Sequence, residues 1–161
     1  MERKELKVGI GWDSHPLVAG RRLILGGVDI PYDKGLSGWS DADVATHAII
    51  DALCGAADLG NIGTLFPSQE PKYKDISSLV LLSKTSELLK AKGFRIVNID
   101  VTVIAQNPKL SPFIPEMRKR ISQALGIDST QVTIKATTTN GLGFIGRGEG
   151  MAAQAVALIQ K

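Results

Sequence analysis

The sequence feature that most constrains the fold is an alternating segment at residues 94–105 (FRIVNIDVTVIA). Val97, Ile99, Val101 and Val103 recur at every second position with polar residues between them, as in a β-strand that is buried on one side. Helical patterns stand before and after this strand. We therefore expect an α+β fold in which a mixed β-sheet carries helices on one face.

Three segments combine helical apolar spacing with end signals, at residues 44–58, 78–92 and 111–126. Ser40 and Asp43 match the S-x-x-D capping box before the first helix, and Gly60 is expected to close it. Glycines also follow the other two helices, and the third begins with a serine N-cap and a proline. The residues that the second helix is expected to bury are Leu79, Leu82, Leu88 and Leu89.

Shorter β-like segments complete the predicted sheet. They span residues 7–12, 132–137 and 153–159, together with residues 23–30, a strand that is expected to bend at Gly26-Gly27. The length of 161 residues corresponds to a single domain, residues 1–161.

Charge, apolar run length and cysteine content indicate which partners the protein can bind and in which cellular compartment it is expected. A net charge of +3 does not indicate nucleic-acid binding. The longest apolar runs, such as residues 79–82, are far shorter than a membrane span, and residues 1–7 lack the apolar segment of a signal peptide. The one cysteine, Cys54, excludes an intrachain disulfide and is expected to fill the core. We expect a cytoplasmic protein that binds neither nucleic acid nor membrane.

One carboxylate and the only two histidines form a candidate metal site. Asp13 and His15 are two residues apart where a strand is expected to end, so their side chains point to the same side, and His47 lies in the first predicted helix. This set suits a divalent transition ion, above all zinc, with a fourth position open for substrate or water, whereas a structural zinc site needs four protein ligands. A capped turn is the simpler explanation of the Asp-x-His pair alone. Asp43 and Asp51 flank His47 on its helix, and either carboxylate is a candidate partner for the second ring nitrogen.

Two loops have a composition that suits phosphate binding. Residues 135–147 place three threonines after a strand, with three glycines that free backbone N–H donors and a cation at Arg147. Residues 61–70 follow the first helix directly. Taken alone, the second of these loops is more simply explained as a plain connection.

Five segments, in this order, resemble the 2-C-methyl-D-erythritol 2,4-cyclodiphosphate synthase family, and together they cover nearly the whole chain. They are residues 9–16 (GIGWDSHP), 38–53 (GWSDADVATHAIIDAL), 59–67 (LGNIGTLFP), 99–117 (IDVTVIAQNPKLSPFIPEM) and 134–150 (IKATTTNGLGFIGRGEG).

The resemblance implies a homotrimer of α+β subunits with active sites at the subunit interfaces. It implies conversion of 4-diphosphocytidyl-2-C-methyl-D-erythritol 2-phosphate to the 2,4-cyclodiphosphate with release of CMP, in the non-mevalonate route to isoprenoids. A catalytic Zn²⁺ and a diphosphate-bound Mg²⁺ or Mn²⁺ are the implied cofactors. Some members hold an isoprenoid diphosphate in an axial cavity, which Trp12 and Arg147 would adjoin here.

The resemblance also implies roles for individual residues. Asp13, His15 and His47 match the zinc ligands, Thr138 matches a threonine that supports the transition state, and Trp39 takes the place of a histidine that hydrogen-bonds phosphate. The implied substrate-binding residues are Ser40, Asn61, Ile62, Gly63, Phe66, Pro67, Ser68, Gln69, Glu70, Ala105, Gln106, Asn107, Pro108, Lys109, Leu110, Ser111, Thr137, Thr139, Asn140, Phe144 and Arg147.

Four positions depart from the family pattern. Trp39 replaces the usual histidine, Asn140 replaces an acidic residue near the second metal, and Asn61 and Ser68 replace carboxylates. An indole N–H can still donate but cannot carry charge, and an amide oxygen is a weaker ligand for a hard dication than a carboxylate. The alternative hypothesis is therefore a catalytically weak paralogue that binds a cytidine nucleotide or an isoprenoid diphosphate.

Overall fold

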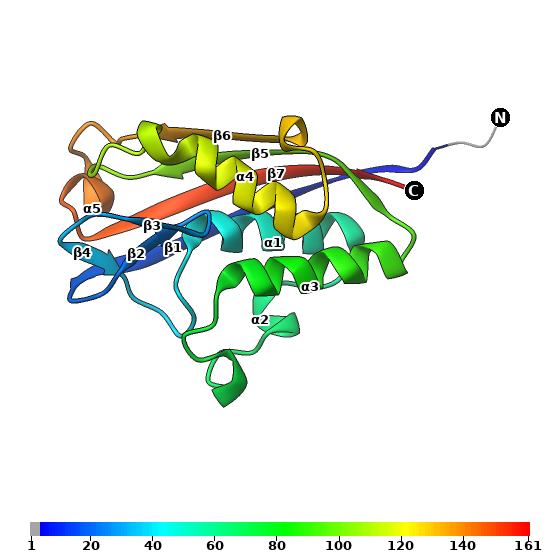
Figure 1. Cartoon of the computed structure of the whole chain (residues 1–161), viewed down its shortest axis with the longest axis horizontal. Coiled ribbons are helices and arrows are strands. Elements are labelled where there is room, and N and C mark those ends of the chain that lie inside the picture. Colours follow the sequence, from blue (N-terminus) through cyan, green and yellow to red (C-terminus); the bar gives the residue numbers. More distant parts are fainter. Residues whose placement is uncertain (1–3) are drawn as a thin grey trace.

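The computed structural model describes residues 4–161 (Figure 1), so part of the polar N-terminal segment, residues 1–3, lies outside the described residues. A five-stranded sheet has the order β4-β1-β7-β5-β6, in which β5 and β6 are parallel and the other neighbours are antiparallel. Its strands are β1 (Leu6–Ala19), β4 (Lys34–Leu36), β5 (Arg95–Ile104), β6 (Val132–Thr137) and β7 (Gly150–Gln160). The expected α+β fold with a mixed sheet is confirmed.

The three long helices lie on one side of this sheet (Figure 1). The longer helices are α1 (Val44–Ala57), α3 (Ser78–Ala91) and α4 (Ile114–Leu125), and the short ones are α2 (Ile62–Leu65) and α5 (Gly143–Gly146). Helix α1 packs directly on β1 and β7, α3 packs against α1, and α4 packs against α3 and β6. Alternate residues of β1, β5 and β7 are buried beneath the helices, as the period of two requires.

The opposite face of the sheet carries an exposed apolar stripe along β1 and β7. Its members are Leu6, Val8, Ile10, Trp12 and Val156. Between residues 4 and 161, none of the three long helices covers this stripe (Figure 1). Contiguous exposed apolar surface of this kind marks an interaction site in many proteins.

Two predicted strands differ from the structure. Strand β1 continues well beyond residues 7–12, because its antiparallel pairing with β7 extends from Leu6 as far as Pro16. Residues 23–30 form a hairpin of β2 (Leu23–Leu25) and β3 (Val28–Ile30) instead of one bent strand. Gly26 and Gly27 both have positive φ (56° and 75°), the backbone that a two-residue hairpin turn requires.

Helix starts also differ from the sequence pattern. Asp43 itself is the N-cap of α1 and accepts from the Thr46 N–H, so the Ser40 capping box is wrong. Ser111 opens a 3₁₀ turn (Ser111–Phe113), and the α-helix begins only at Ile114. Gly126 ends α4 in the left-handed conformation, as predicted.

The predicted burial fails at Leu88 and is only partial at Leu79 and Val97. Leu88 is 38% exposed because it lies on the outer side of α3, away from α1 and the sheet. Val97 is only half-buried because a β-bulge between Ile96 and Asn98 shifts the register of β5 against β7.

Cys54 is fully buried in the core, as predicted. Burial and the nearby Asp51 raise the pKa of its thiol to about 12. Among residues 4–161, no helix has both the length and the apolar character needed to cross a membrane.

Candidate metal centre

Two glycines of β1 bring the candidate ligands together. Gly9 and Gly11 face α1, and a Cβ atom at either position would lie only 1.9 Å from a backbone oxygen of that helix. The absence of these two side chains lets α1 rest directly on β1. His47 on α1 therefore reaches Asp13 and His15, which lie within β1 and not at its end.

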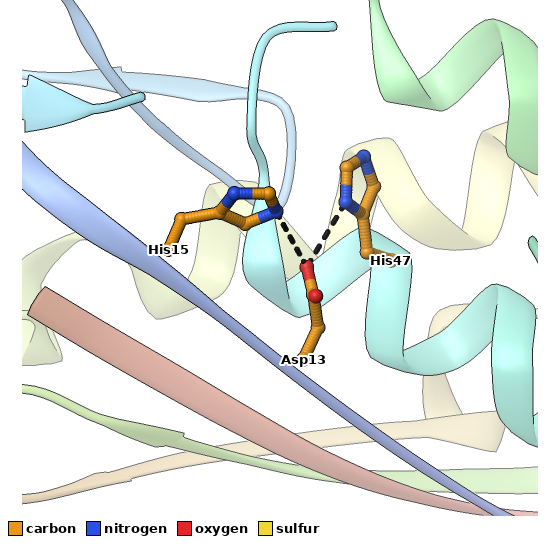
Figure 2. A group of neighbouring side chains, drawn as sticks. All are labelled: Asp13, His15 and His47. Carbon is orange, nitrogen blue, oxygen red and sulfur yellow. Dashed lines mark hydrogen bonds and ion pairs between the residues drawn. The ribbon is translucent and has the colours of Figure 1, made fainter. Parts of the chain in front are cut away.

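The three predicted ligands converge, as Figure 2 shows. Oδ2 of Asp13 lies 2.9 Å from Nε2 of His15 and 3.0 Å from Nδ1 of His47. One ligand atom from each residue lies within 4.8 Å of the other two. The two imidazole rings stand edge to face with centroids 5.5 Å apart.

His15 presents a buried nitrogen without a hydrogen-bond partner. Its Nδ1 lies 3.0 Å from the carbonyl oxygen of Ser37, which can only accept, so Nδ1 carries the proton. Its Nε2 is close to Asp13 in distance, but the geometry is not that of a hydrogen bond, and this atom stays unsatisfied. A buried nitrogen lone pair facing a carboxylate fits a bound cation, and two imidazoles with one carboxylate are a donor set that zinc accepts.

The electrostatics of the site favour a negatively charged Asp13 beside a positively charged His47. Burial alone would raise the pKa of Asp13, but the two imidazole rings beside the carboxylate, His15 and His47, outweigh burial and lower that pKa to about 2. Burial opposes a charged His47 ring, yet the Asp13 carboxylate outweighs burial and raises the pKa of His47. Asp13 is therefore a carboxylate at neutral pH and available as an anionic ligand.

Neither carboxylate that flanks His47 on its helix contacts the ring, so that interpretation was wrong. Asp43 is fully buried and accepts from the N–H groups of Gly26, Gly27 and Thr46. Desolvation, followed by the charge of Asp41, raises its pKa. Because these hydrogen bonds point away from His47, Asp43 joins the β2–β3 turn to the start of α1.

Asp51 likewise points away from His47, since its carboxylate accepts from the N–H of Ile62. The second nitrogen of His47 instead lies 2.8 Å from Oγ of Ser78 and 3.1 Å from Oγ of Ser40. Sequence reasoning missed Ser78 because it lies 31 residues from His47 on another helix.

A cavity of about 190 Å³ adjoins the three ligands. The predicted residues that line it are Trp39, Ser40, Ile62, Gly63, Phe66 and Ser68. Tyr73 and Leu81 also line the cavity and were not predicted. The ring of Tyr73 packs edge to face against the ring of Phe66. Asn61, Pro67, Gln69 and Glu70 belong to the same segment without lining the cavity, and Asn61 caps α2 through its side-chain oxygen.

Trp39 lines this cavity and is hydrogen-bonded to two neighbouring loop residues. Its indole N–H donates to the carbonyl oxygen of Glu70 at 3.0 Å, and its own carbonyl accepts from the N–H of Asp75. The indole N–H that was expected to reach a phosphate is therefore engaged with the protein. A phosphate contact requires this hydrogen bond to break.

Most of the remaining predicted residues line two other pockets, whereas Thr139, Asn140 and Arg147 line neither of them. One, of about 330 Å³, is lined by residues 105–111 with Thr137 and Thr138, and it shares no residue with the cavity at the ligands. Asn140 and Thr139 follow in the next turn, whose Gly141 N–H donates to the side chain of Gln106.

The last pocket, also about 330 Å³, contains Phe144 together with His15 and Glu149. Arg147 forms an exposed ion pair with Glu149 at 2.9 Å. His15 lines both this pocket and the cavity at the ligands, so the two are neighbours that share this residue in their walls.

Fold and site together define an α+β protein with an open Asp-His-His centre. The sequence profile of the YgbB family matches residues 6–160, and the chain belongs to this family. A 2-C-methyl-D-erythritol 2,4-cyclodiphosphate synthase from Pelotomaculum thermopropionicum is 58% identical over 156 residues, which are 97% of this chain and 96% of that protein. A synthase of the same name from Caldicellulosiruptor bescii is 60% identical over 153 residues, which are 95% and 98% of the two chains.

Solved structures agree in fold. The Plasmodium falciparum IspF in complex with CDP has a TM-score of 0.84 and 34% identity, over 96% of this chain and 95% of that one. The bifunctional IspDF of Campylobacter jejuni has a TM-score of 0.94 and 41% identity; the match covers 98% of this chain and 43% of the bifunctional protein.

Proposed function

We propose that this protein is a 2-C-methyl-D-erythritol 2,4-cyclodiphosphate synthase. It converts 4-diphosphocytidyl-2-C-methyl-D-erythritol 2-phosphate to the cyclic diphosphate and releases CMP. The observation that carries the proposal is the convergence of Asp13, His15 and His47 beside a cavity, in a chain whose relatives are 58% and 60% identical and bear this name.

The reaction is an internal phosphoryl transfer. An oxygen of the 2-phosphate attacks the β-phosphorus, a new P–O bond closes the ring, and the P–O bond to the α-phosphate breaks so that CMP leaves with the bridging oxygen. No water is consumed, which makes the enzyme a cyclising phosphorus–oxygen lyase. Positioning and charge neutralisation supply most of the catalysis in such transfers.

Asp13, His15 and His47 would hold Zn²⁺. When bound, zinc supplies a Lewis acid for the β-phosphate, and Mg²⁺ or Mn²⁺ at the diphosphate would neutralise the leaving CMP. Thr138 is proposed to support the transferring group. The pocket formed by residues 105–111 and Thr137 is proposed to bind cytosine, in keeping with the CDP complexes of the Plasmodium falciparum protein and a second solved relative.

The central test is a discontinuous assay of CMP and cyclic product with zinc and magnesium varied separately. We expect both products in equal amounts and no turnover when metal is removed with a chelator. CDP binding without CMP release would instead favour a binding module and would contradict the proposal.

We further propose a homotrimer whose interface is the uncovered sheet face. The exposed stripe that includes Val8, Ile10 and Trp12 needs a partner surface, and the cytosine pocket shares no residue with the metal cavity. An interface could bring one subunit's metal ligands beside its neighbour's cytosine pocket. Trp12, Phe144 and Arg147 would then adjoin an axial cavity suited to an isoprenoid diphosphate.

The double substitution Val8→Glu and Ile10→Glu is expected to yield a folded monomer with little turnover. Two like charges would be placed on the proposed interface while the core side of β1 is untouched. Light scattering measures the mass, and circular dichroism checks the fold. A monodisperse monomer for the unsubstituted protein would overturn the trimer.

Trp39→Phe tests how Trp39 acts. This change keeps an aromatic ring against the cavity and removes the hydrogen bond to Glu70, which is worth about 1 kcal/mol, so KM is expected to rise roughly five-fold while kcat changes little. A fall in kcat at constant KM would instead show that the indole N–H serves the transition state.

A further inference from the structure

We propose that Ser78, held by Asp41, is the positioning residue for His47: it keeps the ring proton on Nε2 and aims Nδ1 at Asp13 and His15. This inference rests on the zinc site of the proposed function and adds two residues that do not touch the metal. It follows from hydrogen-bond accounting around three side chains that come from different segments of the chain.

Ser78 is the first residue of α3 and is fully buried. Its Oγ lies 2.8 Å from Nε2 of His47, closer than the 3.1 Å between that nitrogen and Oγ of Ser40. Both serines approach the nitrogen that faces away from Asp13. The ring of His47 is therefore held between Asp13 on one side and two hydroxyl groups on the other.

The direction of the Ser78 hydrogen bond is set by Asp41. The carboxylate of Asp41 accepts from the Ser78 hydroxyl, from the Ser78 backbone N–H at 2.9 Å and from the Asp43 N–H at 3.1 Å. A serine hydroxyl has one proton, and here that proton points to Asp41. The oxygen of Ser78 can therefore only accept from His47. It favours a proton on Nε2, in competition with the Asp13 carboxylate, which accepts from Nδ1 while no metal is bound.

The tautomer of His15 is also fixed by a hydrogen bond, but its partner is a backbone carbonyl. Its Nδ1 donates to the carbonyl of Ser37, which leaves Nε2 to face Asp13. The two histidines thus present opposite nitrogens to the site. Only the support of His47 comes from a side chain, so only that support can be removed by substitution without altering the backbone.

Ser78→Ala removes this support selectively. The backbone N–H of residue 78 continues to donate to Asp41, so Asp41 still holds the start of α3. Ser86→Ala is the matched control, because Ser86 is a buried serine of the same helix whose hydroxyl donates to the Leu125 carbonyl. Both variants lose one buried hydroxyl, and only one of those hydroxyls contacts His47.

The first measurement is zinc affinity, by competition with a chromogenic chelator on the full chain without substrate. We expect Ser78→Ala to bind zinc about 10- to 100-fold more weakly, as is typical when the partner of a ligating histidine is lost, and Ser86→Ala to bind as the unsubstituted protein does. Ser78→Thr, which retains the hydroxyl, is expected to restore affinity. Affinity that is equal in the two alanine variants would overturn the proposal.

The second measurement separates this proposal from the zinc site itself. Ring ¹⁵N chemical shifts in the metal-free protein, at a pH where the imidazole is neutral, report which nitrogen of His47 carries the proton. We expect the Nε2–H population to fall in Ser78→Ala and to stay constant in Ser86→Ala. An unchanged population in Ser78→Ala contradicts the positioning role, whereas failure of the unsubstituted protein to bind zinc contradicts the proposed function.

Discussion

Asp13→Asn is expected to lower the rate of CMP release by at least about 10³-fold, because several kcal/mol of charge stabilisation depend on the metal and each 1.4 kcal/mol is a factor of ten. The amide keeps the size of the side chain but loses the negative charge that faces both imidazoles. His47→Ala should have an effect of the same order, since two remaining ligands hold zinc weakly. The measurements are zinc content after dialysis and single-turnover CMP release.

Asp29→Asn is the matched control for Asp13→Asn. Asp29 lies on β3 and forms an exposed ion pair with Arg22, so its loss should leave zinc content and turnover unchanged. Full zinc occupancy and normal activity in Asp13→Asn would show that Asp13 is not a zinc ligand.

Gly11→Ala is expected to cost at least about 4 kcal/mol of stability, in the range of severe core overpacking and backbone clashes. The new Cβ would lie 1.9 Å from the carbonyl oxygen of Ala48, a backbone atom in the middle of α1. Helix α1 cannot keep its distance from β1 with this group in place. The same displacement would carry His47 away from Asp13, so zinc binding should fall together with the free energy of unfolding.

Urea titration followed by circular dichroism measures the loss, and Gly55→Ala is the control. Gly55 is also in α1, but among the described residues no atom outside the local backbone of that helix lies within 4 Å of where its Cβ would be. Alanine there should stabilise the helix by about 0.5 to 1 kcal/mol. If Gly11→Ala unfolds at the same urea concentration as the unsubstituted protein, the direct contact of α1 with β1 is wrong.

Local chemistry was sufficient for much of the fold. The alternation of Val101 and Val103 identified a strand with one buried face, and Gly126 identified the end of α4. Asp13 and His15 were expected on one side of the chain from their spacing alone, and this holds although they lie within β1 instead of after it. Periodicity survives such errors because it depends only on the backbone repeat.

Long-range contacts decided the rest. Nothing near Trp39 in the sequence indicates that its N–H is engaged by Glu70, 31 residues away. The partner of His47 was sought on its own helix, yet Ser78 on α3 provides it, because hydrogen-bond partners are set by which helices pack together. The sequence by itself determined which three residues could bind a metal, since that depends on side-chain type and local spacing. The packing of α1 on two glycines of β1 decided that their ligand atoms meet, because only a missing side chain allows that approach.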